Sequence, residues 1–277
     1  MNDTIVENKK YFLSGGGGDF LQCVPFMLAK GQENNRYYVS THLASAESIF
    51  SQLGINIEVI EYFKNINQNK IILAKYKILG ATTPCPRSKY FYNNPFPAPL
   101  WHKFENNYPI IGVHLGGSEF SLRIQSQLSL PLKKLPSTLV EQITQNEVNC
   151  LLFGTKEEID QLNIKQTNNL RFVCEENIAE SLSYVQFCDY FIGSDSVFKT
   201  MSSMLKIPTM VWMGDYSDPF RDRVFTGPYV NDGVMKCYRY NDLNDACVDL
   251  GLQKTFDFFA FYAKNLPNQS MQHPMNT

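Results

Sequence analysis

The chain has 277 residues, of which 44% are hydrophobic and 19% charged, with a formal net charge of −2. This length is enough for two modest domains or one large one. The near-neutral charge gives no electrostatic reason to expect a nucleic-acid partner or a polybasic membrane anchor. No apolar stretch approaches the ~20 residues that span a bilayer, and the polar stretch Met1 to Lys10 lacks a signal-peptide core.

The seven cysteines are scattered, odd in number and without C-x-x-C spacing. Most lie in apolar segments, as Cys150 does beside Leu151 and Leu152. This placement favours buried free thiols in a reducing cytosol over a metal site. We therefore expect a cytoplasmic protein without a bound metal.

The first predicted unit is a strand over Tyr11 to Leu13, a turn of sequence S-G-G-G-G-D, and a helix from Phe20 to about Ala29. The glycines let the backbone approach a ligand and leave amides available at the helix N-terminus. The turn fits neither G-x-G-x-x-G nor the P-loop, and the carboxylate of Asp19 would repel a phosphate. It predicts a place where backbone and one carboxylate meet an uncharged, hydroxyl-rich group. The alternative is that Asp19 only caps the helix.

The rest of the first half shows strand and helix patterns up to a proline-rich and aromatic stretch, Gly80 to Leu100, which is typical of an ordered loop and linker. A domain boundary is expected near Asn106 to Pro109. The expected elements are strands over Tyr37 to Val39, Ile57 to Ile60 and Lys70 to Leu73, and a helix over Thr41 to Leu53 that ends at the C′ residue Gly54.

The second half continues the alternation of strands and helices. The predicted strands are Ile110 to His114, Asn149 to Phe153, Leu170 to Val173 and Val234 to Tyr238; the predicted helices are Pro136 to Gln145, one opening at Gly154 to Glu158, Ile178 to Phe187, and one or two between Asn241 and about Ala263; Leu266 to Thr277 is a polar tail.

The clearest βαβ unit lies between Phe187 and Asp218. Its predicted parts are a strand over Tyr190 to Ile192, the turn Gly193-Ser194-Asp195-Ser196, a helix over Val197 to Leu205, and a strand over Thr209 to Met213 that stops at Gly214-Asp215. In open α/β sheets, ligands bind outside the carboxyl ends of the strands. Both polar turns therefore fall on the side where a ligand would sit. The predicted fold class is α/β, with two Rossmann-like doubly wound domains facing a cleft.

Four stretches together resemble glycosyltransferase family 9, the heptosyltransferases. They are S-G-G-G-G-D-F-L-Q-C-V-P, I-G-V-H-L-G-G-S, I-A-E-S-L-S-Y-V-Q-F-C-D-Y-F-I-G-S-D-S, and L-K-I-P-T-M-V-W-M-G-D-Y-S-D-P. They occur in the family's order and cover most of the chain from Tyr11 to Pro219. The resemblance implies a GT-B fold, with an acceptor domain over 1–107, a sugar-nucleotide donor domain over 108–250, and a C-terminal helix and tail over 251–277.

The resemblance also implies an inverting, metal-independent transfer to a glycan or lipid-linked glycan. The nucleotide-sugar is a co-substrate, ADP-heptose in most of the family, so no cofactor is expected; contact with a membrane surface stays open. Asp19 matches the proposed general base, and the adjoining glycines would meet the acceptor. Val197 stands where the family has glycine. The candidate acceptor-binding residues are Gly16, Gly17 and Gly18, and the candidate donor-binding residues are Gly116, Gly117, Ser118, Arg123, Gly193, Asp195, Ser196, Lys199, Thr200, Gly214 and Asp215.

Other interpretations stay open at this point. Thr200 occupies the place of a family histidine, and Lys199 beside it could stand in as the phosphate cation, as could Arg123 or Arg221. A degenerate GT-B protein that binds a glycan or nucleotide without turnover is the main alternative, and a sugar-nucleotide epimerase is a third. His114 is either a hydrogen-bonded core residue or a catalytic one, and Glu180 either lies at the surface or approaches the ribose.

Overall fold

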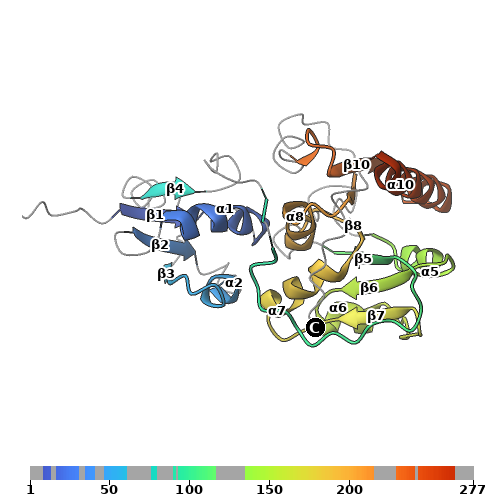
Figure 1. The fold of residues 1–277 in the computed structure, drawn as a ribbon, viewed down its shortest axis with the longest axis horizontal. Coiled ribbons are helices and arrows are strands. Elements are labelled where there is room, and N and C mark those ends of the chain that lie inside the picture. The colour runs from blue at the N-terminus through green and yellow to red at the C-terminus, as the bar shows by residue number, and fades with distance from the viewer. Residues whose placement is uncertain are drawn as a thin grey trace, which may run out of the picture.

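The strands of the computed structural model form two separate sheets, and every ladder between named strands is parallel (Figure 1). The structure describes residues 9–13, 17–30, 35–40, 47–60, 76–79, 90–91, 93–116, 135–214, 229–240 and 243–265. The chain passes from the first sheet to the second between β4 (Lys77–Leu79) and β5 (Ile110–His114).

The first sheet has the strand order β3-β2-β1-β4. Its strand order reverses between β1 and β4, so the carboxyl end of β1 lies at a topological switch point. The elements of this half are β1 (Lys9–Leu13), α1 (Gly17–Lys30), β2 (Asn35–Ser40), α2 (Glu47–Ser51), β3 (Ile57–Ile60) and β4.

The second sheet has the order β10-β9-β8-β5-β6-β7. Numbered within this half, the order is 3-2-1-4-5-6, that of dinucleotide-binding folds, and its switch point lies between β5 and β8. The further elements are α5 (Thr138–Thr144), β6 (Asn149–Phe153), α6 (Lys156–Gln161), β7 (Leu170–Val173), α7 (Ile178–Ser183), the 3₁₀ helix η2 (Tyr184–Phe187), β8 (Tyr190–Gly193), α8 (Val197–Met204), β9 (Thr209–Gly214), β10 (Met235–Tyr240) and α10 (Asp245–Asn265).

Several predicted boundaries are wrong in instructive ways. Helix α1 begins at Gly17 rather than Phe20. The last residues of the predicted glycine-rich turn therefore belong to the first turn of the helix. The helix predicted over Ile178 to Phe187 ends at Ser183 and continues as η2. The strand expected over Lys70 to Leu73 lies outside the described residues, and β4 was not predicted.

Other local signals are confirmed. Gly54 follows α2 with a φ of +66°, and the Ile55 amide donates to the Phe50 carbonyl at 2.9 Å, which is the arrangement of a glycine C′ cap. Thr155 caps α6 in a reciprocal capping box with Glu158. The cysteines match the expectation of burial only in part: Cys23, Cys150 and Cys188 are buried, whereas Cys237 and Cys247 are partly exposed and Cys174 is exposed.

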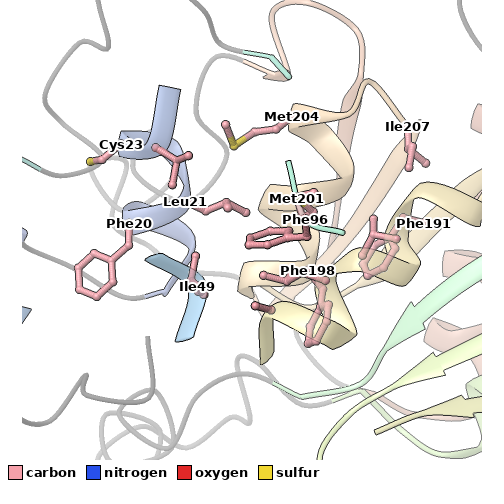
Figure 2. Close-up of a cluster of buried hydrophobic side chains, with 14 of the residues drawn as sticks. Phe20, Leu21, Cys23, Ile49, Phe96, Phe191, Phe198, Met201, Met204 and Ile207 are labelled. Atoms are coloured by element: carbon pink, nitrogen blue, oxygen red, sulfur yellow. The ribbon is translucent and has the colours of Figure 1, made fainter. Parts of the chain in front are cut away.

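The two halves meet through an apolar contact between α1 and α8. Figure 2 shows Leu21 of α1 pointing toward Met201 of α8 and Phe96, with Phe20 and Met204 in the same cluster. Leu21 and Met201 are fully buried. Burial of this apolar surface holds the two halves together.

The segment 93–109 binds the second half by its backbone and aromatic rings. Trp101 stacks on Phe187 with ring centroids 4.5 Å apart. The Arg171 guanidinium donates to the carbonyl oxygens of His102 and Lys103, the latter at 3.0 Å, and lies 4.2 Å from the centroid of the Phe104 ring. The linker therefore follows the elements of the second sheet before entering β5.

Helix α10 packs on the second sheet beside β10 and β9 (Figure 1). It begins at Asp245, so the division expected after residue 250 falls inside it. Gly251 lies against Trp212 and Tyr238, where any side chain would collide with the rings. Neither α10 nor any other helix in the described part of the chain is both long and apolar enough to cross a membrane.

Substituting Gly251 by alanine is expected to destabilise the protein. The added methyl carbon would stand 2.6 Å from Tyr238 Cε1 and 2.7 Å from Trp212 Cζ2, and overpacking of this kind costs about 1–3 kcal/mol. Thermal unfolding should show a loss of about 2–4 °C per kcal/mol. Gln253→Ala, on the exposed side of the same helix, is the control. Equal melting temperatures for Gly251→Ala and the wild type would contradict this packing.

Candidate functional site

The carboxyl ends of β5 and β8 are joined at the switch point of the second sheet. The Ser194 amide donates to the His114 carbonyl at 3.2 Å, and the Ser194 hydroxyl donates to the Gly116 carbonyl at 2.7 Å. Gly193 lies so close that a Cβ there would stand 3.0 Å from the His114 carbonyl oxygen. The two turns predicted to bind the donor, at Gly116 and at Gly193, are therefore adjacent.

The turn after β8 leads into the N-terminus of α8. Ser196 is the N-cap, and its side chain accepts a hydrogen bond from the Lys199 amide at 3.4 Å. Helix N-termini favour anions because the first-turn amides point outward and the helix dipole is positive there. Gly214 ends the neighbouring strand β9 at the same edge. This edge has the geometry to receive a phosphate.

Lys199 and Asp195 form a buried ion pair inside this turn. The Lys199 Nζ lies 2.6 Å from Asp195 Oδ1, and the side chains are only 6% and 12% exposed. Because burial of a single charge is costly, each group neutralises the other. This pairing directs the Lys199 charge toward Asp195, inside the protein.

The first half brings its own predicted residues to this place. A Cβ on Gly18 would stand 2.7 Å from Thr200 Oγ1 and 3.6 Å from the Ser196 carbonyl oxygen. Asp19, the next residue, lies half-buried in the first turn of α1. Thus α1 meets α8 near their N-terminal ends, and the carboxylate predicted to be the base belongs to the turn of α1 that touches α8.

His114 stands at the end of β5 as a buried imidazole. It is 7% exposed, its ring lies 4.7 Å from that of Phe198, and Nδ1 has no hydrogen-bond partner among the described residues. Burial lowers the pKa of His114 from 6.5 to about 4. The imidazole is therefore neutral at pH 7.

Glu180 lies in the first turn of α7 and hydrogen-bonds to the N-cap residue Asn177. Its backbone amide donates to Asn177 Oδ1 at 3.0 Å, and its carboxylate accepts from Asn177 Nδ2 at 2.7 Å. Glu180 is exposed and makes a local cap. The predicted residues that lie outside the described part are Gly16, Gly117, Ser118, Arg123, Asp215 and Arg221.

Sequence reasoning overlooked Arg239 near the carboxyl end of β10. It pairs in register with Met213, next to the pair Tyr240 and Gly214. Strand alternation puts Arg239 on the same face as Cys237, whose thiol pKa responds to Lys199 and Asp195 although burial mainly raises it, to about 11. Arg239 is therefore a half-buried cation on the α8 side of the sheet. The alternation of M-K-C-Y-R-Y was the signal that could have found it.

Comparison with known proteins gives fold relatives. No protein-family model matches the chain. No curated protein matches it by sequence either. Among solved structures, the chain is similar to the glycosyl transferase family 9 protein from Veillonella parvula, with 11% identity, 92% of this chain and 98% of the other covered, and a TM-score of 0.51. The Escherichia coli heptosyltransferase WaaC with ADP gives 10% identity, 90% and 99% coverage, and a TM-score of 0.51.

The chain has a heptosyltransferase-like GT-B fold. This confirms the fold expected from the resemblance. The same fold is shared by a putative UDP-N-acetylglucosamine 2-epimerase from Listeria monocytogenes, at 8% identity, 91% and 89% coverage and a TM-score of 0.52. Because a GT-B-like architecture hosts both kinds of protein, the fold alone leaves the reaction to be argued from the site.

Breaking the buried ion pair is expected to be far more harmful than breaking an exposed one. Lys199→Met removes the ammonium group 2.6 Å from the buried Asp195 carboxylate, and breaking a buried pair from one side costs about 3–5 kcal/mol in unfolding free energy. The matched control is Lys156→Met, which removes an exposed pair with Asp160 of the same i,i+4 spacing and should barely change the denaturation midpoint. The double variant Lys199→Met/Asp195→Asn should recover part of the loss. Equal effects at 199 and 156 would contradict the buried pair.

The buried His114 predicts an acid-sensitive stability. In the unfolded chain this imidazole gains a proton with a pKa of 6.5, whereas in the folded protein its pKa is about 4. Stability is therefore complete above about pH 6.5 and falls as the pH drops toward 4, by about 3 kcal/mol for this group. Urea denaturation across pH 4–7 should show that slope, and His114→Gln should flatten it. An unchanged slope in the variant would show that other groups cause it.

Proposed function

We propose that this protein is an inverting, metal-independent glycosyltransferase that moves a sugar from a nucleotide-diphosphate sugar to a hydroxyl group of a glycan or lipid-linked glycan. The observation that carries the proposal is the contact of Gly18 with Thr200 and Ser196. It brings the turn that bears Asp19 to the N-terminus of α8. The proposal is that Asp19, as the base, acts beside this helix end, which would bind the anion.

The chemistry follows from these two parts. The Asp19 carboxylate takes the proton of the acceptor hydroxyl while its oxygen attacks the anomeric carbon. The bond from that carbon to the diphosphate oxygen breaks on the opposite face, so the configuration inverts. The negative charge that grows on the leaving diphosphate is stabilised by the amides at the N-terminus of α8 and at the Gly116 turn.

A cation is also needed where no metal takes part. Lys199 is already paired with Asp195 and buried, so it is a poor first choice. Arg239 lies on the α8 side of β10, near the carboxyl edge, and an arginine can bind phosphate oxygens in a bidentate manner. We add Arg239 to Arg123 and Arg221 as a candidate for this role.

Replacing the proposed base is expected to abolish transfer and spare donor binding. Asp19→Asn keeps the shape and removes the proton acceptor, so the rate should fall about 10²–10⁴-fold. The assay measures release of ADP or UDP from ADP-heptose or UDP-N-acetylglucosamine with lipid-linked and free glycan acceptors, and calorimetry measures binding of ADP and UDP. Asp257→Asn, on the exposed face of α10, is the control. Full activity in Asp19→Asn would overturn the role of Asp19.

The second candidate is a GT-B protein that binds a nucleotide or glycan without turnover. It is favoured by the neutralised Lys199 and by Val197, which stands where the family has glycine. Binding of ADP or UDP with neither transfer nor donor hydrolysis would support this candidate. Conversion of UDP-N-acetylglucosamine to its 2-epimer would support an epimerase instead. A cytoplasmic location stays a prediction.

A further inference from the structure

A close steric fit between the two halves lies at Gly18 and Thr200. The position of a Cβ on Gly18 is 2.7 Å from Thr200 Oγ1 and 3.5 Å from Thr200 Cβ. An atom pair closer than 3.0 Å forces something to move, whereas 3.5 Å is ordinary contact. The hydroxyl of Thr200 therefore occupies the space that any side chain at position 18 would need.

Thr200 is held so that it cannot give way easily. It is 2% exposed, its amide donates to the Ser196 carbonyl at 3.2 Å, and its hydroxyl lies 3.3 Å from the same oxygen. A β-branched side chain has few rotamers in a helix, and this one is surrounded by protein. A larger group at position 18 would push α1 away rather than turn Thr200.

Farther along the two helices, apolar packing fixes α1 from the other side. Leu21 and Val24 of α1 are fully buried in the core cluster that contains Met201 and Met204 of α8 (Figure 2). Helix α1 is thus drawn toward α8 by this cluster and stopped by Thr200 near its N-terminus. The apolar packing and the contact with Thr200 together set the distance between the first turn of α1 and α8.

We propose that Thr200 is a positioning residue: together with the bare backbone of Gly18 it sets the distance between the Asp19 carboxylate and the N-terminal turn of α8. Asp19 directly follows Gly18 in the first turn of α1, so any shift at Gly18 moves the carboxylate. The consequence for the reaction rests on the proposed function. The steric fit itself does not.

The required precision makes this contact matter. A methyl group on Gly18 would have to move by about 0.7 Å to reach the 3.4 Å at which ordinary contact begins. A base must stand within hydrogen-bond reach of the proton it takes, and misplacement by about 1 Å can cost about 10²-fold in rate. The shift should therefore lower kcat and leave the KM for the donor unchanged.

A double-mutant cycle tests the contact. Gly18→Ala should lower the melting temperature and reduce kcat about 10–100-fold. Alanine has the better helix propensity, so a loss of stability cannot come from propensity. Gly18→Ala/Thr200→Ala should recover both quantities relative to Gly18→Ala, because only ordinary contacts remain, at 3.5 Å to Cβ of residue 200 and 3.6 Å to the Ser196 carbonyl oxygen. Gly18→Ala/Thr200→Val keeps a methyl group in the place of the hydroxyl and should not recover.

The readouts separate this proposal from the proposed function. Thermal unfolding tests the steric fit without any substrate, and release of ADP or UDP tests its effect on turnover. Recovery of the melting temperature with no nucleotide release from any variant, the wild type included, would sink the glycosyltransferase assignment and leave the steric fit standing. A Gly18→Ala variant as stable as the wild type, or recovery of stability without recovery of kcat in an active enzyme, would overturn the positioning role.

Discussion

The apolar contact between α1 and α8 is the interaction on which the rest of the structure depends. The described strands form two separate sheets, and no ladder between named strands joins the two halves. Leu21 and Met201 supply the joint by burying their side chains against each other's helices. Because both helices start near a switch point of their own sheets, this packing brings the two switch-point edges close to each other.

The turn at the N-terminus of α8, next to the apolar contact, holds two charged side chains that are largely buried. Asp195 and Lys199 sit in the turn that a donor phosphate would approach, and they already satisfy each other. An anion arriving there would meet backbone amides rather than the ammonium group of Lys199, which is turned toward Asp195. A cation for the leaving diphosphate would therefore have to come from another residue, as proposed for Arg239.

Much of the fold could be predicted from the sequence because its strands are short apolar runs with clear turns. β5, β6 and β7 lie at the predicted residues, and Gly54 marks the end of α2 as its type suggests. β4 has only three residues and no pattern of its own; pairing with β1 makes it a strand. The switch from α7 to η2 is a tertiary effect that periodicity does not encode.

The candidate site was predictable in its parts and not in its contacts. Asp19 and the turns at Gly116 and Gly193 follow from strand-turn-helix patterns, which are local. The fit of Gly18 against Thr200 joins residues far apart in the chain, and no local pattern reports it. The i,i+4 spacing of Asp195 and Lys199 allowed an ion pair, but only the structure shows that this pair is buried.

The hydrogen bonds from Arg171 to the linker backbone decide which residues of this region can be substituted. Arg171 holds the linker by the carbonyl oxygens of His102 and Lys103, while the side chains of both residues are exposed. Every residue type offers the same carbonyl, so positions 102 and 103 can change identity while the route of the chain is kept. The sequence constraint falls on the partners, Arg171 and the buried ring of Phe104. The course of the linker therefore does not depend on which residues occupy positions 102 and 103.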